Sequence, residues 1–137
     1  GWLSVIQETT SFLEHNLKKD ETFFVIPYGP IYYFLTHRNS PAWQLSFQDY
    51  QHITPNEEMQ TIQDLMKKNV RWVVVLREAN AKPSEKNKNK NIGSGAPPIL
   101  MTFIARNYEL VASFGDWREG EDWGLRHATA IFRKKLP

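Results

Sequence analysis

The chain of 137 residues contains no cysteine, which excludes disulfide bonds, thiolate metal sites and cysteine nucleophiles. It also lacks any apolar run near the roughly 18 residues that a membrane-crossing helix needs, so the chain as given is expected to be soluble. It starts without methionine or a signal-peptide pattern, and we expect it to be a piece of a longer protein.

The chain also lacks a large excess of charge of one sign. Its 17 basic and 15 acidic residues leave a net charge of +2. Without a concentrated basic face, nucleic acid is not an expected partner. The chain is 41% hydrophobic, enough for one domain with one core over residues 1–137.

Motifs for catalysis and cofactor binding are absent as well. There is no Gly-x-Gly-x-x-Gly or Walker loop for phosphate, and no serine lies in a Gly-x-Ser-x-Gly elbow. The histidines are widely separated, whereas a zinc site needs three or four convergent ligands. The sequence therefore predicts no catalytic residue, no metal site and no cofactor.

The first half of the chain alternates between helical and strand patterns. Apolar residues recur at helical spacing over residues 2–18, and a short run that is apolar on both faces, residues 23–26, predicts a buried strand. Ile31 to Leu35 predict a short helix or turn, and residues 37–53 look irregular. A second long helix is predicted from Thr54, a capping residue.

The start and end of that second helix carry specific signals. Pro55 suits the first helical position, Glu57 closes a capping box with Thr54, and Asn69 is a plausible left-handed stop. Residues 71–76 then predict a strand rich in β-branched side chains. The alternation of helix and strand is typical of an α/β sheet.

The second half begins with a polar segment of low complexity, residues 79–96, that predicts a flexible Lys/Asn-rich loop. A short helix is predicted from Pro97-Pro98, followed by strands over residues 108–114 and 126–134. Their hairpin-like connection predicts an antiparallel edge. The predicted fold is a small α/β domain with a mixed sheet of about four strands, parallel at its centre and antiparallel at its edge, with flanking helices.

The amino-acid sequences of several predicted elements are similar to those of a known family. Residues 23–41, FFVIPYGPIYYFLTHRNSP, together with MQTIQDLMKKNVRWVVVL, FIARNYELVASFGDW and AIFRK, resemble the extracytoplasmic C-terminal domain of bacterial membrane glycosyltransferases. These are the protein-mannosyltransferase-like and aminoarabinose-transferase-like enzymes, which use lipid-phosphate sugars. The resemblance covers most of the chain except the Lys/Asn-rich loop.

The resemblance implies a location and a role. In that family the catalytic residue lies in the multi-pass membrane part, so none can be transferred to this sequence. The domain is expected on the outer, periplasmic or extracellular face of the cytoplasmic membrane, linked to a transmembrane domain. There it would contact acceptor, glycan or lipid-linked sugar, or support the membrane domain.

Candidate ligand-binding residues follow the two predicted central strands. In open α/β sheets ligands bind beyond the carboxyl ends of the strands, where Tyr28 and the pair Arg77 and Glu78 are expected. Arg77 could bind a phosphate or carboxylate, and Tyr28 could stack on a sugar. The alternative is that the charges are solvated strand-end residues and that Tyr28 packs.

Tryptophans in predicted loops are a second candidate. Trp117 and Trp123 lie among carboxylates such as Asp116 and Asp122, a combination that suits sugar binding, and Trp43 also lies in a predicted loop. The alternative is that the indoles hold the loops onto the core.

The basic stretch within residues 79–96 is a third candidate. Lys82, Lys86, Lys88 and Lys90 could attract anionic lipid headgroups. The alternative is a solubilising loop.

Three functional hypotheses result. The first is a non-catalytic accessory domain of a membrane glycosyltransferase. The second is a free-standing carbohydrate-binding or protein-interaction module. The third is a small hydrolase or nucleotide-binding enzyme whose site would require a nucleophile beside a histidine or carboxylate in a deep pocket.

Overall fold

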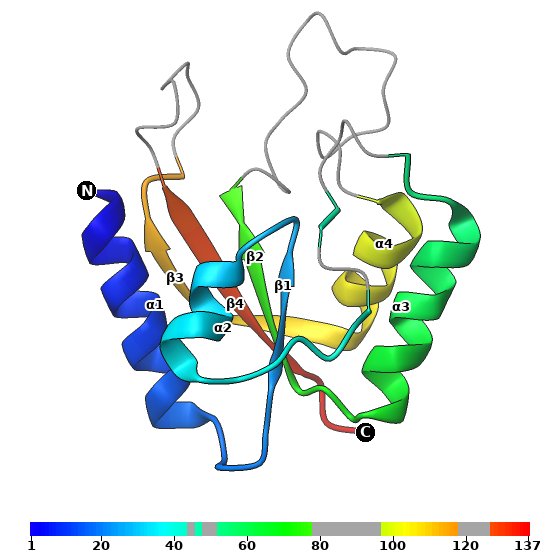
Figure 1. The fold of residues 1–137 in the computed structure, drawn as a ribbon, viewed down its shortest axis with the longest axis horizontal. Coiled ribbons are helices and arrows are strands. Elements are labelled where there is room, and N and C mark those ends of the chain that lie inside the picture. Colours follow the sequence, from blue (N-terminus) through cyan, green and yellow to red (C-terminus); the bar gives the residue numbers. More distant parts are fainter. Residues whose placement is uncertain (44–45, 48–51, 78–96, 118–126) are drawn as a thin grey trace, which may run out of the picture.

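A computed structural model of the chain describes residues 1–43, 46–47, 52–77, 97–117 and 127–137. Four helices and four strands lie in these ranges (Figure 1). In chain order they are α1 (Trp2–Asn16), β1 (Phe23–Ile26), α2 (Pro30–Thr36), α3 (Pro55–Lys67), β2 (Trp72–Leu76), α4 (Pro98–Asn107), β3 (Tyr108–Gly115) and β4 (Ala128–Lys134). The predicted Lys/Asn-rich loop, residues 79–96, lies outside the described residues.

The strands form one mixed sheet in the order β1-β2-β4-β3. β1 and β2 are parallel, whereas β4 pairs antiparallel with both β2 and β3. The predicted class, a small α/β domain with a mixed four-stranded sheet and an antiparallel edge, is confirmed. The parallel pair lies at one side of the sheet, since β4 inserts between β2 and β3.

Helices cover both faces of this sheet and make three layers (Figure 1). Phe24 and Val73 face a core shared with α3 and α4, whereas Phe23 and Val74 face a second core shared with α1 and α2. Alternate side chains of a strand point to opposite faces, so β1 and β2 must be apolar throughout. This explains their continuous hydrophobic runs.

Signals at the ends of α3 act as the sequence predicts. The Thr54 side chain accepts a hydrogen bond from the Glu57 N–H at 3.1 Å, and Pro55 occupies the first turn. After the helix, Asn69 takes a left-handed conformation with φ of 49°. These local contacts satisfy backbone groups that the helix ends would otherwise leave without partners.

β1 stays buried at the side of the sheet because other segments cover its open edge. The Val25 N–H donates to the Tyr33 hydroxyl at 3.0 Å, and the Phe47 N–H donates to the Pro27 carbonyl at 2.7 Å. The predicted irregular segment 37–53, as far as it is described, therefore serves as a cover for β1.

Candidate functional site at the carboxyl edge of the sheet

Three strands end on one side of the sheet, and the fourth strand begins there; we call this side the carboxyl edge. β1 and β2 are parallel and end there, and antiparallel β4 begins there. Tyr28 follows β1 and Arg77 follows β2, so both lie at this edge as the sequence predicts. Asp116 follows β3, and His127 precedes β4.

A glycine allows β3 and β4 to meet closely at this edge. Gly115 has a φ of +89°, a conformation that side chains with a Cβ rarely adopt. An added Cβ would collide with the His127 carbonyl oxygen and lie 2.8 Å from the Val5 side chain. This close approach places Asp116 beside His127, and the Asp116 N–H donates to the His127 carbonyl at 3.4 Å.

A partly buried polar contact fixes the His127 ring. Nε2 of His127 is hydrogen-bonded to the Tyr32 hydroxyl at 2.9 Å, and the two rings lie nearly parallel, 17° apart. Tyr32 is fully buried, whereas His127 is half-buried. Tyr32 thus links α2 to the first residue before β4 and holds the imidazole at the edge of the sheet.

A hollow of about 330 Å³ opens at this position. Two carboxyl-bearing residues, Glu8 and Asp116, line it together with His127. Ser4 also lines it, and its hydroxyl donates to the Gly1 carbonyl at 2.8 Å. The hollow therefore offers acceptors for hydroxyl or amino groups, and its serine hydroxyl is held by the start of α1.

Two further features of the described residues bear on chemistry at this site. No cluster of three or more metal-ligating side chains is found among them. Burial raises the pKa of Tyr33 and of Tyr108 to about 12, so neither phenol supplies a base near neutral pH.

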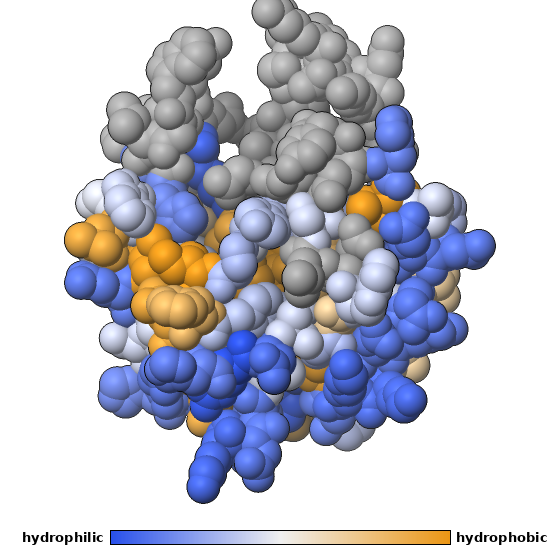
Figure 2. All heavy atoms as spheres, viewed as in Figure 1, coloured by the Kyte–Doolittle hydropathy of each residue, from blue (hydrophilic) through white to orange (hydrophobic). Residues whose placement is uncertain are grey.

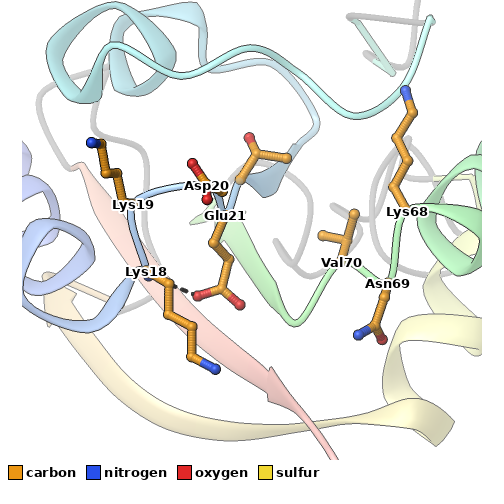
Figure 3. Close-up of a pocket in the computed structure, with 8 residues that line it drawn as sticks. Lys18, Lys19, Asp20, Glu21, Lys68, Asn69 and Val70 are labelled. Atoms are coloured by element: carbon orange, nitrogen blue, oxygen red, sulfur yellow. Dashed lines mark hydrogen bonds between the residues drawn. The ribbon is translucent and has the colours of Figure 1, made fainter.

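A larger hollow of about 690 Å³ lies at the opposite edge, where β1 and β2 begin (Figure 3). Lys18, Lys19 and Lys68 line it, but their ammonium groups point away from one another (Figure 3). Lys68 Nζ donates to the Pro41 carbonyl at 2.5 Å. Three diverging cations do not make a convergent anion site.

Two acidic residues, Asp20 and Glu21, line this second hollow, and Glu21 has an internal partner. Arg71 Nε and Nη2 donate to the two Glu21 carboxylate oxygens at 2.5 and 3.3 Å. Burial raises the pKa of Glu21, but the hydrogen bond and charge of Arg71 and the Lys18 backbone N–H outweigh it. The pKa of Glu21 therefore lies below its ordinary value, and the pair is a structural clamp.

The structure places the candidate residues as follows. Tyr28 is 46% exposed, and Arg77 is partly exposed and engaged in contacts. Trp117 is half-buried, and its buried indole N–H has no hydrogen-bond partner among the described residues. Glu78 and Trp123 lie outside the described residues. Tyr28, Arg77 and Trp117 thus share the carboxyl edge, and their binding role stays a prediction.

Other predicted side chains are placed elsewhere or not described. Trp43 is 87% exposed, and Lys82, Lys86, Lys88 and Lys90 lie outside the described residues. Sequence reasoning missed His127 and Glu8 as lining residues of the hollow. A signal for His127 was present, because it directly precedes an antiparallel strand that starts at the edge where β1 and β2 end.

Comparison with known proteins finds a similar solved structure but no matching family. No family model matches the chain, and no curated protein does either. Among solved structures, the crystal structure of the C-terminal globular domain of an oligosaccharyltransferase from Archaeoglobus fulgidus is similar. The TM-score is 0.47 at 16% sequence identity, over 94% of this chain and 96% of that chain.

At this TM-score and identity, the similarity does not define the function of this chain. The resemblance to bacterial protein-mannosyltransferase-like and aminoarabinose-transferase-like enzymes is not confirmed by these comparisons and stays a prediction. In the part of the chain that the structure describes, every helix is too short or too polar to span a bilayer.

Proposed function

We propose that this chain is a non-catalytic accessory domain of a multi-pass membrane glycosyltransferase that uses lipid-phosphate sugars. On this proposal it lies on the outer face of the cytoplasmic membrane, linked to the membrane domain. The resemblance of residues 23–41 to the C-terminal domain of such enzymes motivates the proposal. The observation that carries it is an exposed apolar surface over α1 and α2.

Figure 2 shows hydrophobic side chains gathered over α1 and α2. We call this the α1–α2 surface, and its exposed members are Trp2, Leu3, Ile31, Phe34 and Leu35. Phe34 is 77% exposed, and Trp2 and Leu3 are each 56% exposed. Clustered exposed apolar side chains mark interaction sites more often than isolated ones do. A domain that supports a larger assembly needs such a surface.

The test is made in the full-length protein. The Phe34→Asp variant is expected to lower transfer of sugar from the lipid-phosphate donor while the protein is still produced and folded, since this side chain packs little within the domain. Trp43→Asp is the matched control, because Trp43 is exposed to a similar degree and is not part of the α1–α2 surface. Equal activity of both variants and the parent would contradict the proposal.

A specific observation favours a second candidate, a carbohydrate-binding module. Glu8, Asp116 and His127 line one hollow, and Trp117 follows Asp116 in the chain. Acidic and aromatic groups together suit sugar hydroxyls and the apolar faces of sugar rings. Glycan titration should then show binding that Trp117→Ala and Trp123→Ala abolish, and binding that survives both changes would exclude the role of the indoles.

A further inference from the structure

The two edge strands of the sheet, β1 and β3, differ in what covers their outer sides. Tyr33 and Phe47 cover the outer side of β1. β3 ends the sheet on the other side, and none of the described strands pairs with its outer edge. An open strand edge presents unpaired N–H and C=O groups and is a template for pairing with another chain.

The backbone groups that face this open edge can be identified. The Asp116 N–H bonds to the His127 carbonyl, which continues the ladder beyond the Gly115–Ala128 pair. In an antiparallel ladder, hydrogen-bonded and non-bonded pairs alternate. Ser113, three residues before Asp116, therefore directs its N–H and C=O away from β4. The register shift between Leu110 and Ala112 limits the regular part of this edge to its C-terminal half.

A groove of about 480 Å³ runs between the outer side of α1 and the end of β3. Phe12 and Phe114 contact edge to face, with ring centroids 6.1 Å apart, and form its apolar part. Polar α1 side chains line the rest, and two of them bond to the backbone of α1 itself. His15 is hydrogen-bonded to the Ser11 carbonyl at 2.7 Å, and Asn16 donates to the Phe12 carbonyl at 2.8 Å.

The acidic side chain that lines the groove, Glu8, can accept a partner's cation. Glu8 is exposed, and among the described residues its carboxylate forms no hydrogen bond or ion pair. The groove therefore combines an apolar floor, one unpaired negative charge and a strand edge with free backbone groups. Each of these features recognises a different part of an extended polypeptide.

We propose that an extended segment of a partner polypeptide adds to the outer edge of β3 as a fifth strand. Its backbone bonds to β3, and alternate side chains, which point to one face, enter the groove beside α1. An apolar or aromatic side chain rests on Phe12 and Phe114, and a lysine or arginine meets Glu8. This inference does not rest on the proposed function.

Charge complementarity favours a foreign segment over a second copy of this chain. The β3 sequence, YELVASFG, contains no lysine or arginine. Pairing of β3 with β3 of a second copy would bring no cation of that strand to Glu8. A partner segment with alternating basic and apolar residues supplies what β3 cannot.

The probe is a synthetic heptapeptide, Thr-Val-Thr-Lys-Thr-Phe-Thr, titrated into the ¹⁵N-labelled chain. The amides of Ala112 and Ser113 and those of α1 around Glu8 are expected to shift. Glu8→Gln should weaken binding by about threefold to tenfold, because a charge-assisted contact is lost. Glu14→Gln, on the same helix but paired with Arg38, is the matched control and should leave the affinity unchanged.

Two N-methylated peptides test the strand geometry itself. One carries N-methyl groups on its threonines and the other on the valine, lysine and phenylalanine. Since alternate N–H groups point to opposite edges of a strand, one peptide should lose binding and the other should keep it. Equal affinity of the two peptides, or no shift with the unmodified peptide, would overturn the proposal. So would sedimentation as a dimer that Ser113→Pro dissociates, which would show a second copy as the occupant.

Discussion

The Glu58 carboxylate caps the helix that contains Leu100. Oε1 of Glu58 accepts hydrogen bonds from the backbone N–H groups of Ile99 at 2.9 Å and Leu100 at 3.1 Å. Glu58 lies on α3 and is only 3% exposed, and α4 has no side-chain cap of its own. A negative charge at the positive end of α4 thus joins the two helices on one face of the sheet.

Replacing this carboxylate should weaken the fold. Glu58→Ala leaves two N–H groups of α4 unsatisfied in a buried place, which costs on the order of 1–3 kcal/mol in the free energy of unfolding. Chemical denaturation measures the loss. Asn56→Ala, at an exposed position of the same helix, should change the free energy by no more than about 0.5 kcal/mol. Equal losses in the two variants would contradict the capping role.

A buried hydroxyl pair predicts non-additive mutations. Thr9 Oγ1 and Thr129 Oγ1 are 2.7 Å apart, and both residues are fully buried between α1 and β4. Either single change to valine leaves one hydroxyl unpaired and should cost roughly 1–3 kcal/mol, whereas the double change removes both and should cost much less than the sum. A double-mutant cycle by denaturation measures the coupling, and simple additivity would rule it out.

The Glu21–Arg71 clamp predicts how stability responds to acid. Because the folded-state pKa of Glu21 is below its ordinary value of 4.5, its contribution is present above that pH and is lost as pH falls through the folded pKa. Arg71→Gln should therefore destabilise the chain near neutral pH, with a smaller effect once Glu21 is protonated. Denaturation of both proteins between pH 7 and pH 2 checks this, and parallel curves would contradict it.

The close approach of β3 and β4 at Gly115 should not tolerate a larger side chain at this position. Gly115→Ala forces a Cβ toward the His127 carbonyl at a positive φ, and it should cost at least about 1 kcal/mol. Ser113→Ala, at an exposed position of the same strand, is the control. The amide resonance of Asp116 should also shift in the glycine variant, since its bond to His127 is disturbed. An unchanged thermal midpoint would show that the backbone adapts without strain.

The features that could be predicted from the sequence are local ones. The boundaries of α3 follow from Thr54, Pro55 and Asn69, which act on backbone groups within a few residues. The burial of β1 and β2 follows from their uninterrupted apolar runs. These patterns also define the α/β class, because helix and strand periodicities alternate along the chain.

The features that could not be predicted join distant parts of the chain. From the sequence, Glu58 would be expected to be an ordinary polar residue of a helix. Only the packing of α3 on α4 brings its carboxylate to the N–H groups of Ile99 and Leu100. The contact between Tyr32 and His127 depends on the insertion of β4 beside β2. No local pattern encodes either pairing.

The proposed link to a membrane glycosyltransferase is checked by sequencing the parent gene on both sides of the region that encodes this chain. We expect eight or more hydrophobic spans of membrane-crossing length upstream of Gly1. A parent gene that encodes no such span would exclude this link and leave a free-standing binding module as the function to pursue.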